Sequence, residues 1–209
     1  MEFDYLYSNI DQLIKMPLPG IEAHKTLSPL QRPLFSKYNI PISAKKAGVL
    51  VLLYPNQKQE TTILLTKRAH YKGTHSNQIS FPGGKKNPED RDLETTAIRE
   101  TYEEVGLPQT DITVHKQLST IYIPPSNFEV DSYLATIPYT PIFSKNYEVE
   151  EIIHLTLEEL LNPNNLTTFK TATSYANNIE VPCFMFNEHC VWGATAMILS
   201  EVKEVLKNL

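Results

Sequence analysis

The feature that most restricts how this chain can fold is residues 81–107, FPGGKKNPEDRDLETTAIRETYEEVGL, where a glycine turn directly precedes a helical pattern. In the turn, Phe81 is a bulky apolar anchor and Pro82 fixes its own φ, whereas Gly83 and Gly84 are free to adopt positive φ. Backbone carbonyls can then point where a side chain would otherwise block them. We therefore predict a turn that presents main-chain oxygen atoms.

The second half of this segment carries the start and stop signals of a helix. Either Asp90 or Asp92 can serve as the N-cap, and Gly106 followed by Pro108 signals the end. Between these signals we expect a helix of about three turns. The turn and the helix together would place main-chain oxygen atoms next to helical side chains.

Acidic side chains gather on one face of the predicted helix. Glu100, Glu103 and Glu104 are three and four residues apart, and Arg99 is spaced to pair with Glu103. Like charges near a helix C-terminus cost stability unless a cation neutralises them. Carboxylate oxygens are the ligands that Mg²⁺ and Mn²⁺ prefer. A solvated acidic face is the ordinary alternative, but the neighbouring glycine turn favours a metal site.

Two stretches of this segment, GG at residues 83–84 and RETYEEVGL at residues 99–107, resemble the signature of the Nudix hydrolases. In that family the glycine carbonyl and the glutamates hold a divalent metal, and the enzymes hydrolyse a nucleoside diphosphate linked to another group. The resemblance implies an α/β/α sandwich with a mixed β-sheet between helices, and Mg²⁺ or Mn²⁺ as cofactor. The implied metal ligands are Gly84, Glu100, Glu103 and Glu104, and the implied catalytic residues are the same three glutamates and Arg99.

One residue is inserted relative to the usual spacing of the family signature. Six residues after the second glycine stands Asp90, whereas eight residues before the arginine stands Arg91. The outer acidic position of the signature therefore has three candidates, Asp90, Asp92 and Glu94. We favour Asp92 slightly over Asp90. Thr101 stands where an apolar residue is usual.

Three further stretches resemble the coenzyme A pyrophosphatase branch of the family. They are LLTKRA at residues 64–69, EVEE at residues 148–151 and WGATA at residues 192–196. Gly73 and Asn77 depart from the pattern of that branch. Acidic positions of the EVEE stretch either supply a remote ligand or base, or form an ordinary charged strand end.

The basic residues before the glycine turn are candidates for substrate binding, because they should border the metal site. Arg68 is the leading candidate for a bidentate phosphate contact, Lys67 and Lys72 are weaker ones, and Phe81 is a candidate at the turn itself. The resemblance implies hydrolysis of coenzyme A to 3′,5′-ADP and 4′-phosphopantetheine. The alternatives are a pyrophosphatase for ADP-ribose or a related compound, and a non-catalytic nucleotide sensor.

Composition and missing motifs narrow the class of protein. The net charge of −5 without a basic patch argues against nucleic acid as partner. No apolar run approaches the roughly 20 residues of a membrane span, and the N-terminus does not resemble a signal peptide, so we expect a cytoplasmic protein without a membrane partner. The two cysteines, Cys183 and Cys190, are expected to be buried thiols rather than a zinc site or disulfide.

Hydrophobic periodicity predicts the remaining elements. We expect strands at 47–54, 61–67, 115–123, 130–137, 151–156 and 179–186, and helices at 157–161 and 193–206. An amphipathic helix is predicted before Pro17, followed by an irregular connector at 21–45 in which His24 has no special role. The expected division is an N-terminal helix and connector, 1–45, and a hydrolase domain, 46–209. The apolar stripe of the first helix either packs on the domain itself or forms a homodimer.

Overall fold

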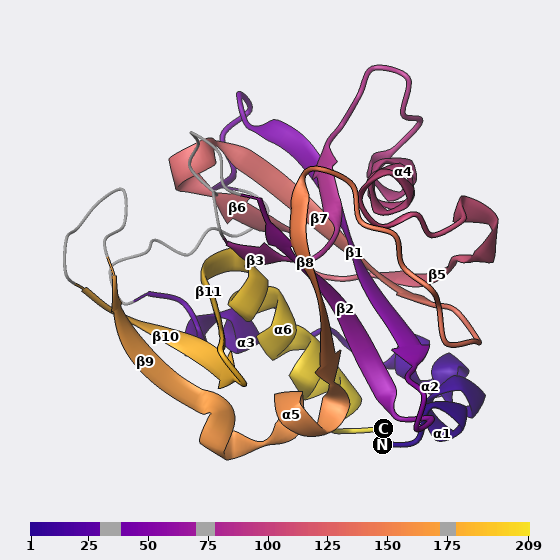
Figure 1. Ribbon diagram of the computed structural model, residues 1–209. Helices are drawn as coiled ribbons and strands as arrows, with labels where there is room; N and C mark the ends of the chain where they lie inside the picture. The colour runs from indigo at the N-terminus through magenta and orange to yellow at the C-terminus, as the bar shows by residue number, and fades with distance from the viewer. Residues whose placement is uncertain (30–38, 70–77, 172–178) are drawn as a thin grey trace.

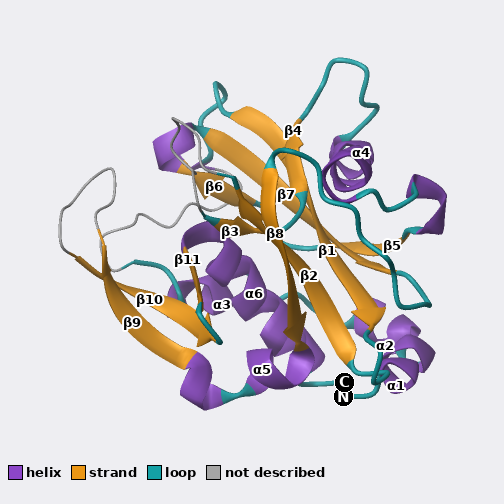
Figure 2. Ribbon diagram, in the orientation of Figure 1, coloured by secondary structure: helices purple, strands orange, loops and turns teal. Residues whose placement is uncertain are grey.

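The computed structural model describes residues 1–29, 39–69, 78–171 and 179–209. A twisted sheet of eight strands crosses the molecule, and helices lie on both of its faces (Figure 1). A three-stranded sheet lies to one side, next to the C-terminal helix (Figure 2). This is the α/β sandwich that the sequence predicts.

The large sheet contains both parallel and antiparallel pairs. β1 runs parallel to β7 and antiparallel to β2 and β4, while β3 and β8 pair with β2, and β5 and β6 pair with β7. The sheet is therefore mixed, as predicted. Its strands are β1 (Lys45–Pro55), β2 (Thr61–Arg68), β3 (Ile79–Ser80), β4 (Gly83–Lys85), β5 (Thr113–Gln117), β6 (Ile121–Ile123), β7 (Phe128–Thr136) and β8 (Val149–Thr156).

The other elements surround this sheet. The small sheet has the order β11-β10-β9, and all of its pairs are antiparallel. Its strands are β9 (Leu166–Thr171), β10 (Ile179–Phe186) and β11 (His189–Trp192). The helices are α1 (Phe3–Ser8), α2 (Ile10–Lys15), α3 (Ile21–Thr26), α4 (Leu93–Val105), α5 (Leu157–Leu161) and α6 (Gly193–Leu206).

Alternating residues of the central strands build two separate hydrophobic cores. Leu50 and Leu52 of β1 point to a cluster that includes Ala97 and Val105 of α4. The intervening residues Val51 and Leu53 point to a larger cluster with α1, α5 and α6. Because strand side chains alternate between faces, an uninterrupted apolar strand is the expected sequence for a sheet covered on both sides.

The place of α4 on the sheet depends on a glycine. A Cβ atom added at Gly48 of β1 would lie 2.1 Å from the Leu93 carbonyl oxygen, so only glycine lets the start of α4 approach so closely. On the same strand, Gly48 pairs with Gly84 and Val49 pairs with Gly83 of β4. β1 therefore holds both the glycine turn and the acidic helix.

Several sequence predictions are wrong in detail. The single N-terminal helix is two short helices separated at Asn9, and the strand predicted at 115–123 is interrupted between β5 and β6. The connector predicted at 21–45 contains α3. His24 on α3 is only 4% exposed, and its Nε2 lies 3.5 Å from Oε2 of Glu201.

Buried contacts join the N-terminal helices to the rest of the domain. Phe3, Leu6 and Leu13 belong to the same core cluster as α6, so the apolar stripe packs within the chain. Glu201 of α6 is fully buried and accepts hydrogen bonds from the Gly20 amide at 3.1 Å and the Ser119 hydroxyl at 2.6 Å. A charge in this position needs such donors, because an unpaired buried carboxylate is strongly destabilising.

Two other expectations can be compared with the described residues. Cys183 is buried and Cys190 is half-buried; both are free thiols, and burial raises the pKa of each. No helix in the described part of the chain is long and apolar enough to span a membrane.

Candidate active site

Both ends of the acidic helix α4 are fixed by local capping. The Asp92 carboxylate accepts hydrogen bonds from the Thr95 amide at 2.8 Å and the Thr95 hydroxyl at 2.7 Å. Gly106 closes the helix in the left-handed conformation at φ 72°. Of the two predicted N-caps, Asp92 is the residue used, and the predicted end is confirmed.

The glycine turn brings backbone into contact with a carboxylate of α4. Gly83 has φ 147°, and a Cβ atom there would lie 2.4 Å from the Gly48 carbonyl oxygen. A Cβ atom at Gly84 would lie 2.5 Å from the carboxyl carbon of Glu100. The Glu100 carboxylate thus rests against the main chain of Gly84, in a space that any side chain would fill.

Glu104 is the most deeply buried carboxylate of the helix face. Its residue is 3% exposed, and burial raises the pKa of its carboxyl group to about 8, although the nearby Arg68 guanidinium lowers it. The closest guanidinium nitrogen of Arg68 lies 3.8 Å from Oε1. Among the described residues, Oε2 has no hydrogen-bond partner. A buried carboxylate oxygen in this state is suited to a cation.

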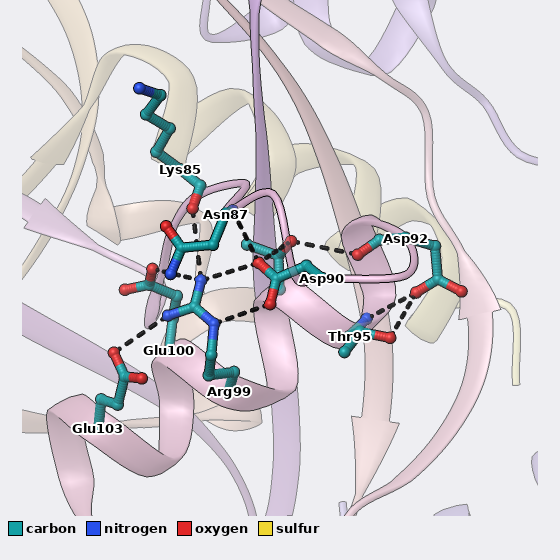
Figure 3. A network of polar contacts seen from close by, with 9 residues as sticks. Lys85, Asn87, Asp90, Asp92, Thr95, Arg99, Glu100 and Glu103 are labelled. Atoms are coloured by element: carbon teal, nitrogen blue, oxygen red, sulfur yellow. Dashed lines mark hydrogen bonds and ion pairs between the residues drawn. The ribbon is translucent and has the colours of Figure 1, made fainter.

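Arg99 connects the other two glutamates of the face (Figure 3). One guanidinium nitrogen lies 2.9 Å from Oε1 of Glu100, and another donates to Oε2 of Glu103 at 3.0 Å. Burial raises the pKa of Glu100, and the hydrogen bond and charge of Arg99 lower it. Arg99 therefore orients the carboxylates of both neighbours, including the predicted i,i+4 pair with Glu103.

Asp90 holds Arg99 in place from the opposite side. Its two carboxylate oxygens accept from Nε and a terminal nitrogen of Arg99, each at 2.9 Å, and it also accepts from the Asn87 amide and the Thr96 hydroxyl. The hydrogen bond from Arg99 is the largest cause that lowers the pKa of Asp90. The side chain is 4% exposed, so Asp90 is a positioning residue for the arginine (Figure 3).

These contacts describe the three candidates for the outer acidic position. The Asp90 carboxylate accepts hydrogen bonds from Arg99. The Asp92 carboxylate caps the helix by accepting from the Thr95 amide, and it also accepts from Nε of Arg91 at 2.7 Å. Glu94 lies in the first turn of α4. Asp90, the acid six residues after Gly84, is therefore the candidate that is hydrogen-bonded to Arg99.

A loop before β8 brings a further carboxylate to the same face. The Ser144 amide donates to the Val105 carbonyl at 2.8 Å, and the Asn146 amide donates to the Glu104 carbonyl at 3.0 Å. The Glu148 carbonyl accepts from the Ala69 amide at 2.8 Å. The Glu148 carboxylate is close enough to raise the pKa of both Glu100 and Glu104. The EVEE stretch thus contributes one acid to the site.

The three candidate substrate-binding residues have different surroundings. Leu64 and Leu65 of β2 enter opposite cores, so Arg68 leaves the strand on the α4 face and Lys67 on the α6 face. Lys67 forms an ion pair with Glu150 at 2.8 Å. Its assignment to the same site as Arg68 is therefore not supported by the alternation along β2.

Phe81 is also not placed for a substrate contact. It is 2% exposed and belongs to the core cluster that faces α6, because the bulky ring anchors the turn in the interior. Its role as an apolar anchor fits the structure, whereas its role in substrate binding does not. Lys72, the remaining basic candidate, lies outside the described residues.

The donor atoms fit a hard divalent metal ion. Glu100 and Glu104, together with the main-chain carbonyl group of Gly84, offer only oxygen, which suits Mg²⁺ or Mn²⁺. The unpartnered Oε2 of Glu104 supports this fit. In the described part of the chain, no three acidic, histidine or cysteine side chains already surround one point. Glu103, the third predicted glutamate ligand, is bonded to Arg99 as Glu100 is, but its side chain is 50% exposed.

Comparison with known proteins identifies the class. A family model described as the NUDIX domain matches residues 44–174, which include the glycine turn, α4 and the Glu148 loop. The chain belongs to the Nudix family and is a Nudix hydrolase that acts on pyrophosphate bonds.

Individual relatives agree with this assignment. The chain is 28% identical over 163 residues to an uncharacterized Nudix hydrolase, NudL, of Yersinia pestis and of Yersinia pseudotuberculosis, covering 77% of this chain and 79% of the relative. Among solved structures, the Nudix hydrolase RenU from M. smegmatis has a TM-score of 0.56 at 15% identity, covering 86% of this chain and 96% of RenU. A MutT protein from Methanosarcina mazei has a TM-score of 0.51 at 17% identity, covering 81% and 100%. These structures share the fold.

Proposed function

We propose that this chain is a metal-dependent pyrophosphatase that hydrolyses the diphosphate of coenzyme A or its derivatives to 3′,5′-ADP and 4′-phosphopantetheine. The observation that supports the catalytic part is Glu104, a buried carboxylate with an unpartnered oxygen beside Glu100 and the glycine turn. The substrate assignment rests on the sequence resemblance of residues 64–69, 148–151 and 192–196 to the coenzyme A branch.

Different side chains of the site have separate roles in metal binding, in orienting the carboxylates and in phosphate binding. Glu100 and Glu104, with the Gly84 carbonyl, would hold the metal, and Arg99 fixes the direction of Glu100 and Glu103. A bound Mg²⁺ or Mn²⁺ supplies charge for the phosphate oxygens and lowers the pKa of water. Arg68, beside Glu104, faces the same space and can bind phosphate through its planar donors.

Proton transfer needs a carboxylate near the attacking water. Glu103 and Glu148 are the exposed acids at the edge of the site, whereas Glu104 and Asp90 are both buried. A positioned general base contributes about 10²-fold to 10⁴-fold in rate. The pH dependence of turnover in Glu103→Gln and Glu148→Gln would show which of the two accepts the proton.

The substrate is tested by incubating the purified chain and Mg²⁺ or Mn²⁺ with coenzyme A, acyl-coenzyme A, dephospho-coenzyme A, ADP-ribose, NADH and dinucleotides. Products are identified by mass. We expect higher kcat/KM for coenzyme A than for dephospho-coenzyme A, because a cation at the 3′-phosphate is worth roughly tenfold to a hundredfold in specificity. Arg68→Ala should narrow this gap.

Lys67→Ala is the matched control, since it removes a neighbouring cation from the opposite face of β2 and should leave the gap unchanged. Equal rates on the two coenzymes, or faster cleavage of ADP-ribose, would reject the coenzyme A assignment. Binding without cleavage of any compound would instead indicate a nucleotide sensor. A cytoplasmic location and a homodimer stay predictions. The division of the chain into an N-terminal helix and connector, 1–45, and a hydrolase domain, 46–209, is also still a prediction.

A further inference from the structure

An exposed aromatic ring stands at the edge of the carboxylate site. Tyr147 is 87% exposed, although the loop that carries it is fixed on both sides. Before it, the Asn146 amide donates to the Glu104 carbonyl at 3.0 Å. After it, the Glu148 amide donates to the Asn146 side chain at 2.9 Å, and the Glu148 carbonyl accepts from Ala69. The ring is therefore held in solvent by an anchored backbone.

The surroundings of Tyr147 tie it to the acidic face of α4. It directly precedes Glu148 in the chain, and the carboxylates of Glu148 and Glu103 both raise the pKa of its hydroxyl group. A tyrosine in this position keeps its polar tip on the acids and leaves the ring faces open. Exposing such a ring gains nothing for folding, because its apolar area stays in water.

Two other exposed tyrosines of the described residues have hydroxyl groups bonded away from this site. The Tyr5 hydroxyl donates to the carbonyl of Leu209 at 3.1 Å, and the Tyr139 hydroxyl donates to Asp111 at the far end of the same loop. Tyr147 is the most exposed tyrosine of the described residues, and it lies between Asn146, which bonds the Glu104 carbonyl, and Glu148.

We propose that the ring of Tyr147 is the platform on which the nucleobase of the substrate stacks. This inference rests on the proposed pyrophosphatase function. A nucleoside diphosphate derivative has a flat base separated from its phosphates by a sugar, so the base must lie beside the metal carboxylates rather than among them. Every base has a π-face, and stacking on an aromatic side chain tolerates different bases. Tyr147 would thus select compounds with a nucleobase over other diphosphates.

The test measures binding of ADP and of inorganic pyrophosphate to the full chain in Mg²⁺ by calorimetry. We expect Tyr147→Ala to weaken ADP binding roughly fivefold to a hundredfold. Tyr147→Phe keeps the ring and should bind ADP nearly as the wild type does. Pyrophosphate has no base, so its affinity should be the same in all three proteins.

Tyr139→Ala is the matched control, because it removes an exposed tyrosine of the same loop whose hydroxyl also binds an acid. It should bind ADP like the wild type. Unchanged ADP affinity in Tyr147→Ala, or an equal loss of pyrophosphate affinity, would overturn the platform. With the cleaved substrate, Tyr147→Ala should raise KM and change kcat little.

The proposed function has a separate measurement, which is cleavage by the wild type. If the wild type cleaves diphosphates and Tyr147→Ala still binds ADP normally, only the platform fails. If the wild type cleaves nothing, the pyrophosphatase fails, and with it the role of the ring in that reaction.

Discussion

Replacing Glu104 by glutamine should stabilise the metal-free protein at alkaline pH while it abolishes activity. The pKa of Glu104 is raised from 4.5 to about 8 by burial. Between these values the folded state holds a proton that the unfolded state has lost, so its contribution is full below pH 4.5 and is lost as pH rises through 8. The difference of about 3.5 units corresponds to about 5 kcal/mol at most.

Relaxation around the charge reduces this figure, so we expect a loss of about 2 to 5 kcal/mol between pH 5 and pH 9 in the wild type. The glutamine side chain of Glu104→Gln does not titrate, so the variant should not show this loss of stability. The assay is urea unfolding in a chelator at several pH values, with turnover measured in parallel at saturating Mg²⁺. Turnover of the variant should fall about 10²-fold or more.

Glu103→Gln is the control for this comparison. Its carboxylate is on the same helix face, but its side chain is 50% exposed. It should lower turnover as strongly and leave the pH dependence of stability as in the wild type. Parallel pH curves for the wild type and Glu104→Gln would refute the reasoning. Wild-type turnover in Glu104→Gln would refute its role as a metal ligand, and wild-type turnover in Glu103→Gln would refute its role as a base.

Three shorter predictions follow from single contacts. Gly84→Ala places a methyl group on the Glu100 carboxylate, so kcat should fall at least tenfold while the melting temperature, followed by circular dichroism, changes little. Asp90→Asn removes the carboxylate that holds Arg99, so the free energy of unfolding in urea should fall by about 1.5 to 3 kcal/mol and kcat should also fall. A variant with wild-type stability and wild-type kcat would exclude the positioning role. Glu201→Gln places an amide group where the carboxylate accepts hydrogen bonds, so the free energy of unfolding should fall by about 1 to 3 kcal/mol while kcat stays unchanged.

The elements that the sequence predicts well are those with local signals. α6 begins and ends at the predicted residues, and α4 ends at Val105 with Gly106 as its cap, because apolar periodicity and helix stop signals depend only on neighbours in sequence. The hairpin of β1 and β2 is likewise read from two apolar runs around a short turn. The very short strands β3 and β4 have no periodicity of their own, and form because β2 and β1 offer them backbone partners.

Contacts between distant residues escape this type of prediction. Nothing near His24 indicates that it will be buried against Glu201 at the other end of the chain. Burial also decides between two roles of Phe81, since an apolar residue beside a polar site can face either the core or the substrate. The acidic face of α4 was visible in the spacing of its glutamates, but the approach of Glu148 depends on how the loop before β8 folds.

Two hydrogen bonds couple the opening of the loop before β8 to the opening of the last turn of α4. The Ser144 and Asn146 amides bond the carbonyls of Val105 and Glu104, so the loop cannot lift away without exposing the last turn of the helix. Deuterium should therefore enter both amides in one shared opening event rather than independently. The exchange rate of either amide would report how often the residues around Glu104 become open to water.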